Sequence, residues 1–167
     1  MRDGKFVPLQ QQDPTRWDRE DLAAAEALLR TAAGERRPGR FQIEAAIQSA
    51  HASARLLGRE DVGAVLELYA ALLAFTPSIG AAVAHAAAAA RVHGAEYALG
   101  LLDGIAAENG ARVREYQAWW ALRADLLGKV GKVGEAAEAY RRAIGLSQDE
   151  AVRGFLMGRL RGVKGGA

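Results

Sequence analysis

Apolar residues recur at i, i+3, i+4 and i+7 along most of the chain, which is the spacing of helices that bury one face. Strand signals are nearly absent, because β-branched residues are sparse and no stretch alternates for long. Glycine, proline and an Asn-Gly pair fall between the periodic stretches, where helices are expected to end. The pattern predicts an all-α fold with eight helices, over residues 16–33, 41–57, 62–75, 79–93, 95–108, 114–130, 133–146 and 149–161.

Small polar residues just before these stretches are expected to cap the helices, because their side chains can accept hydrogen bonds from the first free backbone N–H groups. Asp13 or Thr15 would cap the first helix, and Asp61 the third. Ser78 would cap the fourth helix and Ser147 the eighth.

One stretch, Ile79 to Ala90, raises the question of a membrane span, since only His85 in it is polar. It is shorter than the ~18 apolar residues that a span needs, and most of it is alanine. The N-terminal residues lack the apolar core of a signal peptide. The sequence therefore predicts a packed helix at this stretch, no membrane association and a cytoplasmic location.

The helices repeat in pairs, and the second helix of each pair carries the same three positions at i, i+4 and i+7. These sets begin 33 or 38 residues apart: Val65, Tyr69 and Leu72; Ala98, Leu102 and Ile105; Ala136, Tyr140 and Ala143. Twelve residues before each set stands a small residue, followed three residues later by Leu or Ala: Ser53 and Leu56; Ala86 and Ala89; Ala124 and Leu127. Because small residues let neighbouring helices approach closely, the pattern indicates a helix–turn–helix unit with a period near 34.

This unit resembles the tetratricopeptide repeat, and the third pair resembles it most. The resemblance implies a right-handed superhelix of about three helix pairs, with the first and eighth helices capping its ends. Residues 1–14 are then an N-terminal extended segment, 15–162 the helical domain and 163–167 a flexible tail, with residues 111–116 inserted in a loop between repeats. The resemblance also implies a concave groove lined by mostly small and apolar positions of the first helices: Ile47, Ala50, His51, Ala54, Gly80, Val83, Ala84, Ala87, Ala118, Ala121, Leu122 and Asp125.

Catalytic chemistry finds little support in the residues. The chain has no cysteine, so it has neither a thiol nucleophile nor a disulfide. The segment GKVGKVGE (128–135) looks like a phosphate-binding loop, but position 126 is Leu and no hydroxyl residue follows Lys132. Metal ligation is not expected from the histidines, which neither form an H-x-x-x-H pair nor adjoin clustered carboxylates: His51, His85 and His93.

The remaining polar and aromatic clusters have structural explanations. Acidic pairs at residues 60–61 and 149–150 stand where helix N-termini favour negative charge. Of the adjacent Trp119 and Trp120, at least one is expected to face the core. A net charge of +2 is too small to imply nucleic-acid binding by itself. We therefore expect no enzyme, no cofactor and no metal, and a surface for a protein partner.

A second resemblance covers most of the chain, from residue 4 to residue 160. Six segments carry it in order: QQQDPTRWDRE (10–20), RFQIEAAIQSAHA (40–52), LYAALLAFTPS (68–78), GLLDGIA (100–106), ALRADLLGKVGKVGEAAEAYRRAIGLS (121–147) and DEAVRGFLMGRL (149–160). They are similar to the C-terminal extension of a group of bacterial extracytoplasmic-function sigma factors. In that group a tetratricopeptide-like helical domain follows the promoter-binding regions.

This resemblance implies a regulatory or protein-interaction domain of an RNA polymerase sigma factor that modulates transcription initiation. The implied partners are its own sigma regions, core RNA polymerase or a signalling protein, without direct DNA contact. The chain has no segment like the promoter-binding regions, and Ala84-His85 stands where the family has Asn-Arg. The alternative is a stand-alone tetratricopeptide-like scaffold that binds a peptide or helix of an unrelated partner.

The candidate partner-binding residues lie at the junction of the first helices and in the implied groove: Trp17, Asp18, Phe41, Gln42, His51, Arg123 and Asp125. A purely structural role competes for several of them. Trp17, Phe41 and Arg123 could instead clamp neighbouring helices, with Arg123 pairing a carboxylate. The oligomeric state is left open by the sequence.

Overall fold

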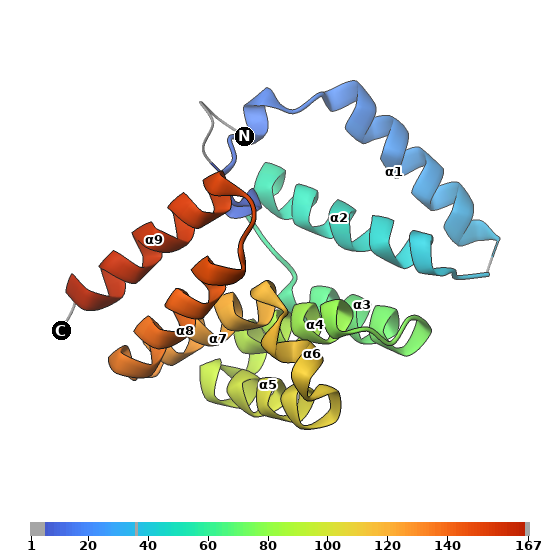
Figure 1. Cartoon of the computed structure of the whole chain (residues 1–167). Coiled ribbons are helices and arrows are strands. Elements are labelled where there is room, and N and C mark those ends of the chain that lie inside the picture. The colour runs from blue at the N-terminus through green and yellow to red at the C-terminus, as the bar shows by residue number, and fades with distance from the viewer. Residues whose placement is uncertain (1–5, 36, 166–167) are drawn as a thin grey trace. The chain divides into compact units, whose positions relative to one another are not determined.

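The computed structural model describes residues 6–35 and 37–165, and these form α-helices, 3-10 turns and loops without a strand (Figure 1). The predicted all-α class is therefore confirmed. The described residues contain two short 3-10 turns and nine α-helices: η1 (Leu9–Gln11), η2 (Pro14–Arg16), α1 (Arg19–Gly34), α2 (Arg40–Leu57), α3 (Val62–Phe75), α4 (Ile79–His93), α5 (Ala95–Asn109), α6 (Ala111–Arg114), α7 (Gln117–Lys129), α8 (Val133–Leu146) and α9 (Glu150–Gly165). None of these helices is both long enough and apolar enough to cross a membrane.

The chain divides into two compact units at a point inside α4. Residues 8–81 form one, which we call the α1–α3 unit. Among the described residues, the other unit consists of residues 82–165 together with Phe6 and Val7, and we call it the α5–α9 unit. In this unit the ring of Phe6 packs edge-on against Phe155 of α9, with 5.5 Å between the ring centroids. The division falls within residues 15–162, which the sequence pattern treats as one domain.

The α1–α3 unit has its core between α2 and α3. Ile43 and Ile47 of α2 pack there with Leu72 of α3 and with Ala81. By contrast, α1 lies along α2 but buries none of its own residues (Figure 1). Because apolar burial supplies most of a helix's stability in a protein, α1 is the least anchored helix of this unit.

The α5–α9 unit has a core rich in alanine. It is formed by residues of α7, α8 and α9: Ala124, Leu127, Ala136, Ala139, Tyr140, Ala143 and Leu156. The helix α8 packs against both α7 and α9, and α5 packs against α7. Small side chains let these helix axes approach, while the single large ring of Tyr140, 1% exposed, fills the space that remains.

Two of the predicted caps are confirmed, at Asp61 and Ser78. The Asp61 carboxylate accepts a hydrogen bond from the backbone N–H of Ala64 at 2.9 Å, at the start of α3. The Ser78 hydroxyl accepts one from the N–H of Ala81 at 3.1 Å, at the start of α4. The helix ends after α2 and α4 fall at glycines with positive φ, Gly58 and Gly94, as the sequence predicts.

The caps predicted for the first and last helices were wrong by a few residues. Asp13 caps the 3-10 turn η2, and Asp18 caps α1 by accepting from the N–H of Glu20 at 2.9 Å and of Asp21 at 3.1 Å. At the other end Asp149, not Ser147, accepts from the first N–H groups of α9. In both places a second capping residue stands nearer to the helix than the one that the pattern favoured.

Several predicted boundaries also change, and the first of them is that α1 begins at Arg19 and not at residue 16. The segment 111–116 was predicted as a loop, but residues 111–114 form the short helix α6, so the next helix begins at Gln117 and not at residue 114. At the C-terminus α9 continues through Gly165, past the helix end predicted at residue 161 and into the segment 163–167 that was predicted as a flexible tail. The predicted extended segment 1–14 contains η1 and the start of η2, and its residues 1–5 lie outside the described part.

Candidate partner-binding site

The structure does not gather the seven predicted partner-binding residues into one unit. Five of them belong to the α1–α3 unit and two, Arg123 and Asp125, to the α5–α9 unit.

Asp18 and Trp17 stand just before α1 and have different roles. Asp18 is exposed, and its carboxylate is occupied as the N-cap of α1. Trp17 is half-buried, and it lines a groove between α1 and α2. The capping role of Asp18 accounts for that residue without a partner.

Phe41 is the most exposed large apolar residue among those that the structure describes, at 79% of its surface. Its ring lies 5.7 Å from the guanidinium carbon of Arg40, and it does not clamp helices as the structural alternative required. The neighbouring Gln42 is half-buried. An exposed aromatic ring on the first turn of a helix is the kind of side chain that protein interfaces use as an anchor.

His51 is held by two side chains of the same unit. Its Nδ1 lies 3.7 Å from a carboxylate oxygen of Glu60, and its Nε2 lies 3.4 Å from the hydroxyl of Tyr69 on α3. Tyr69 is half-buried, and burial raises the pKa of its phenol above the ordinary value of 10.0. These contacts tie α2 to α3, so they give His51 a structural role.

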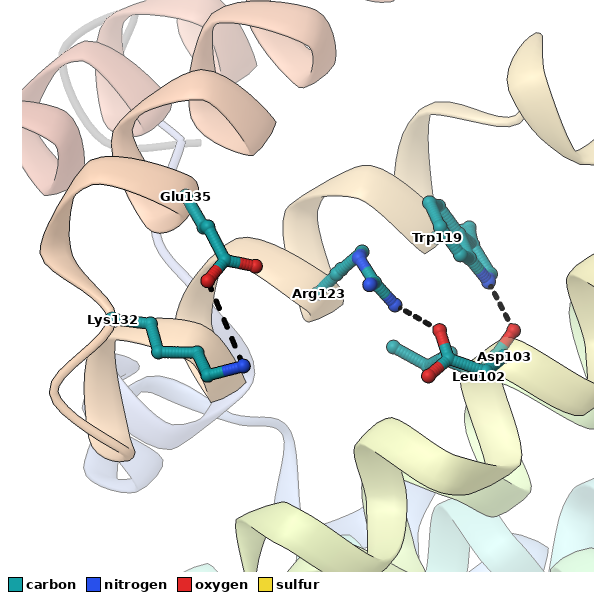
Figure 2. A network of polar contacts seen from close by, with 6 residues as sticks. All are labelled: Leu102, Asp103, Trp119, Arg123, Lys132 and Glu135. Carbon is teal, nitrogen blue, oxygen red and sulfur yellow. Dashed lines mark hydrogen bonds and ion pairs between the residues drawn. The ribbon is translucent and has the colours of Figure 1, made fainter.

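Arg123 of α7 pairs with a carboxylate, as the structural alternative predicted (Figure 2). Its Nη1 lies 2.5 Å from Oδ1 of Asp103 on α5, and its guanidinium lies 5.1 Å from the ring centroid of Trp119. The indole N–H of Trp119 donates to the backbone carbonyl of Leu102, also on α5, at 3.1 Å. Two polar contacts therefore fasten α7 to α5.

Trp119 and Trp120 differ in burial, as expected. Trp119 is 5% exposed and belongs to the core, whereas Trp120 is half-buried. The indole N–H of Trp120 donates to the carbonyl of Arg114 at 3.0 Å. The two rings meet edge to face, with 4.8 Å between their centroids.

Asp125 belongs to a polar network between α7, α8 and α9. Its carboxylate pairs with Lys129 at 2.8 Å and with Arg159 of α9. The Nε of Arg159 donates to the hydroxyl of Tyr140 at 3.4 Å. Burial raises the pKa of Tyr140 above 10.0, although the hydrogen bond and charge of Arg159 oppose that shift. The same bond to Tyr140 raises the pKa of the Arg159 guanidinium.

The groove positions implied by the tetratricopeptide pattern are partly wrong. Ile47 is 2% exposed and Val83 is 6% exposed, so both belong to the core and cannot contact a partner. Ile47 packs toward α3 because the apolar stripe of α2 faces that helix. Ala84 and His85 are half-buried.

The glycine-rich segment between α7 and α8 is a helix C-cap. Gly131 has a φ of 78°, and its N–H donates to the carbonyl of Gly128 while the N–H of Lys132 donates to that of Leu127. This pair of bonds is the Schellman motif, which satisfies the last carbonyls of α7. Lys132 also pairs with Glu135 at 3.6 Å across the first turn of α8 (Figure 2). Gly131 is thus explained without a phosphate ligand.

One feature of the α1–α3 unit was missed by sequence reasoning, namely the groove between α1 and α2 that Trp17 lines. Its volume is about 480 Å³. The signal for it was present as small residues on α2, at positions 45, 49 and 52, opposite an alanine-rich α1. In the described residues, no three His, Cys, Asp or Glu side chains lie close enough to hold a metal ion.

A protein of Rhizobium meliloti (strain 1021), described as uncharacterized, is 33% identical to this chain over 153 residues. The match covers 92% of this chain and 35% of that protein. The chain therefore spans about a third of the length of the curated relative that it matches. No family model and no solved structure matches the chain.

Proposed function

We propose that this chain is a tetratricopeptide-like interaction domain of the kind that follows the promoter-binding regions of extracytoplasmic-function sigma factors. Its partner is a protein of transcription initiation, either the sigma regions themselves or core RNA polymerase. By binding there it modulates initiation.

The burial of the repeat positions is the observation that carries the tetratricopeptide-like part of the proposal. In the pair α7–α8, the repeat positions Ala124, Ala136, Tyr140 and Ala143 are each at most 1% exposed. In the middle pair, Ala86, Ala98 and Leu102 have no exposed surface at all. This is the burial expected where small residues let the helices of a repeat approach and one larger side chain fills the gap.

The first pair deviates from this pattern. Leu56, which corresponds to the 3% exposed Leu127 of the third pair, is 42% exposed. Tyr69 in the aromatic position is half-buried. The tetratricopeptide-like packing is therefore proposed on the strength of the second and third pairs.

Two further observations support a role within transcription. The ordered segments that resemble the sigma-factor extension include those that form α2 and the α7–α8 pair. In the Rhizobium meliloti relative, the matched region accounts for 35% of the protein, so there the helical region is one part of a longer chain. A domain that acts on another part of its own protein, or on a shared partner, fits that arrangement.

Phe41 is the proposed anchor for the partner. It is 79% exposed and lies on the first turn of α2, within a segment that carries the family resemblance. Leu28 of α1, in the same unit, is 71% exposed. Aromatic side chains are among the residues that carry most of the binding energy in protein interfaces, and the exposed ring of Phe41 is available for that role.

Co-purification tests the proposal. The chain would be mixed with core RNA polymerase and, separately, with the two promoter-binding regions of a sigma factor of this group. We expect a complex with at least one of them, weakened by Phe41→Ala and unchanged by Tyr97→Ala, which removes an exposed aromatic ring from the other unit. If neither binds under conditions where an intact sigma factor binds core polymerase, the proposal is wrong.

A further inference from the structure

The groove between α1 and α2 has the size and shape of a small-molecule site. Each helix contributes four residues spaced i, i+3, i+4 and i+7, which are Leu22, Ala25, Glu26 and Leu29 of α1 with Ala45, Gln48, Ser49 and Ala52 of α2. Such a set spans two helical turns, about 10 Å. The volume of about 480 Å³ falls within the range of pockets that enclose drug-sized ligands.

The segment before α1 lines one end of this groove, with Leu9, Gln12 and Trp17. It is held there by Arg55 near the end of α2, whose Nη2 donates to the backbone carbonyl of Gln12 at 2.7 Å. The groove is thus lined on a third side, and its length of about two helical turns suits a compact ligand.

The lining has one ionisable side chain. Of the residues that line the groove, Glu26 alone carries a charge, and it is half-buried. Its carboxylate accepts a hydrogen bond from the Ser49 hydroxyl across the groove, and apolar side chains make up most of the remaining wall. A carboxylate in apolar surroundings attracts a cation more strongly than one in water does. The indole ring of Trp17 favours a cation as well.

We propose that this groove binds a single lipophilic organic cation, with its apolar body between Leu22, Leu29 and the alanines and its positive charge near Glu26. Binding would give α1 the apolar contacts that it lacks, because α1 has no buried residue in the free protein. The site is independent of the protein partner proposed above.

Two probes of equal size and opposite charge test the proposal. Tetraphenylphosphonium is the lipophilic cation, and tetraphenylborate is the matching anion. By isothermal titration calorimetry we expect the cation to bind the full chain with 1:1 stoichiometry, at least about tenfold more tightly than the anion. Equal binding of the two ions, or no saturable binding of the cation, would overturn the proposal.

Two groove variants and one control variant test whether the ligand binds in the groove. Glu26→Gln removes the charge and should weaken cation binding by about tenfold. Ala45→Phe adds a ring on the groove wall at an exposed position and should abolish binding. The matched control is Glu20→Gln, which removes an exposed charge of α1 outside the groove and should leave binding unchanged. Circular dichroism would establish that each variant is folded, and unchanged affinity in both groove variants would refute the site.

Discussion

Trp119 of α7 donates its indole N–H to the backbone carbonyl of Leu102 on α5, across the boundary between the second and third helix pairs. Leu102 occupies the position where the tetratricopeptide pattern has an aromatic residue, so the middle pair lacks a large ring of its own there. Trp119 brings a ring to this boundary from the neighbouring pair and is itself 5% exposed. The contact accounts for how α5 and α7 pack closely although position 102 carries no aromatic ring.

Replacing Trp119 by Phe should destabilise the α5–α9 unit. The variant loses a buried hydrogen bond and part of a buried ring, which together amount to about 1–3 kcal/mol of the free energy of unfolding. Urea denaturation followed by circular dichroism measures the change. The control is Trp120→Phe, whose hydrogen bond is exposed, and which should lose less. An equal loss in the two variants would contradict the role given to Trp119.

Ala86 tests whether α4 is packed as the repeat pattern requires. It has no exposed surface, so Ala86→Leu must force neighbouring helices apart and should cost about 1–3 kcal/mol. The same change at the exposed Ala107 of α5 should stay within about 0.5 kcal/mol. Thermal denaturation compares the two, and an unchanged melting temperature for Ala86→Leu would count against the packing described for α4.

Sequence pattern was sufficient for the helices and for the α7–α8 pair. Alanines at 124, 136 and 143 with Tyr140 are buried because their spacing puts them on facing stripes of two adjacent helices. Gly131 ends α7 because a left-handed residue is needed there, which glycine supplies without strain. These features depend on local spacing, which the sequence displays directly.

The features that sequence reasoning missed depend on competition between two possible capping residues or on the distance between helices. Asp13 and Asp18 both carry a capping signal, and Asp18 caps α1 because Pro14 follows Asp13 and a 3-10 turn forms there. The groove beside α1 depends on the separation of two helix axes, which no periodicity specifies. Ile47 was placed in a concave surface by analogy with a repeat, whereas the apolar stripe of α2 turns it toward α3.

The N-cap residue Asp18 should affect the stability of α1 alone. Since α1 buries no residue, losing the N-cap in Asp18→Ala should lower its local stability by about 1 kcal/mol and speed hydrogen exchange in α1. The stability of the whole protein should hardly change. Asp61→Ala is the comparison, because it removes the N-cap of α3, which carries the buried Val65 and Leu72. Losing this cap should therefore lower the free energy of unfolding of the whole α1–α3 unit. Slower or unchanged exchange in α1 of the Asp18 variant would contradict this assignment.

The buried phenol of Tyr140 should make the folded protein less stable at alkaline pH. Burial raises the pKa of its phenol above 10.0 in the folded protein, so the neutral form is favoured by folding. The stabilisation that comes from burying the neutral phenol is complete below pH 10. It is lost as the pH rises through the pKa of Tyr140 in the folded protein, because ionisation then favours the unfolded chain. Urea midpoints at about pH 8 and about pH 11 should differ less for Tyr140→Phe than for the wild type. An identical difference in the two proteins would refute the effect.

The central claim, that this domain acts in transcription initiation, is tested most directly by adding it to a transcription reaction. A sigma factor of the group, stripped of its C-terminal extension, would be combined with core polymerase and its promoter, and the purified chain titrated in. We expect a saturable change in the amount of run-off transcript, and a weaker change with Phe41→Ala. A transcript yield that does not vary at any concentration of the chain would contradict it.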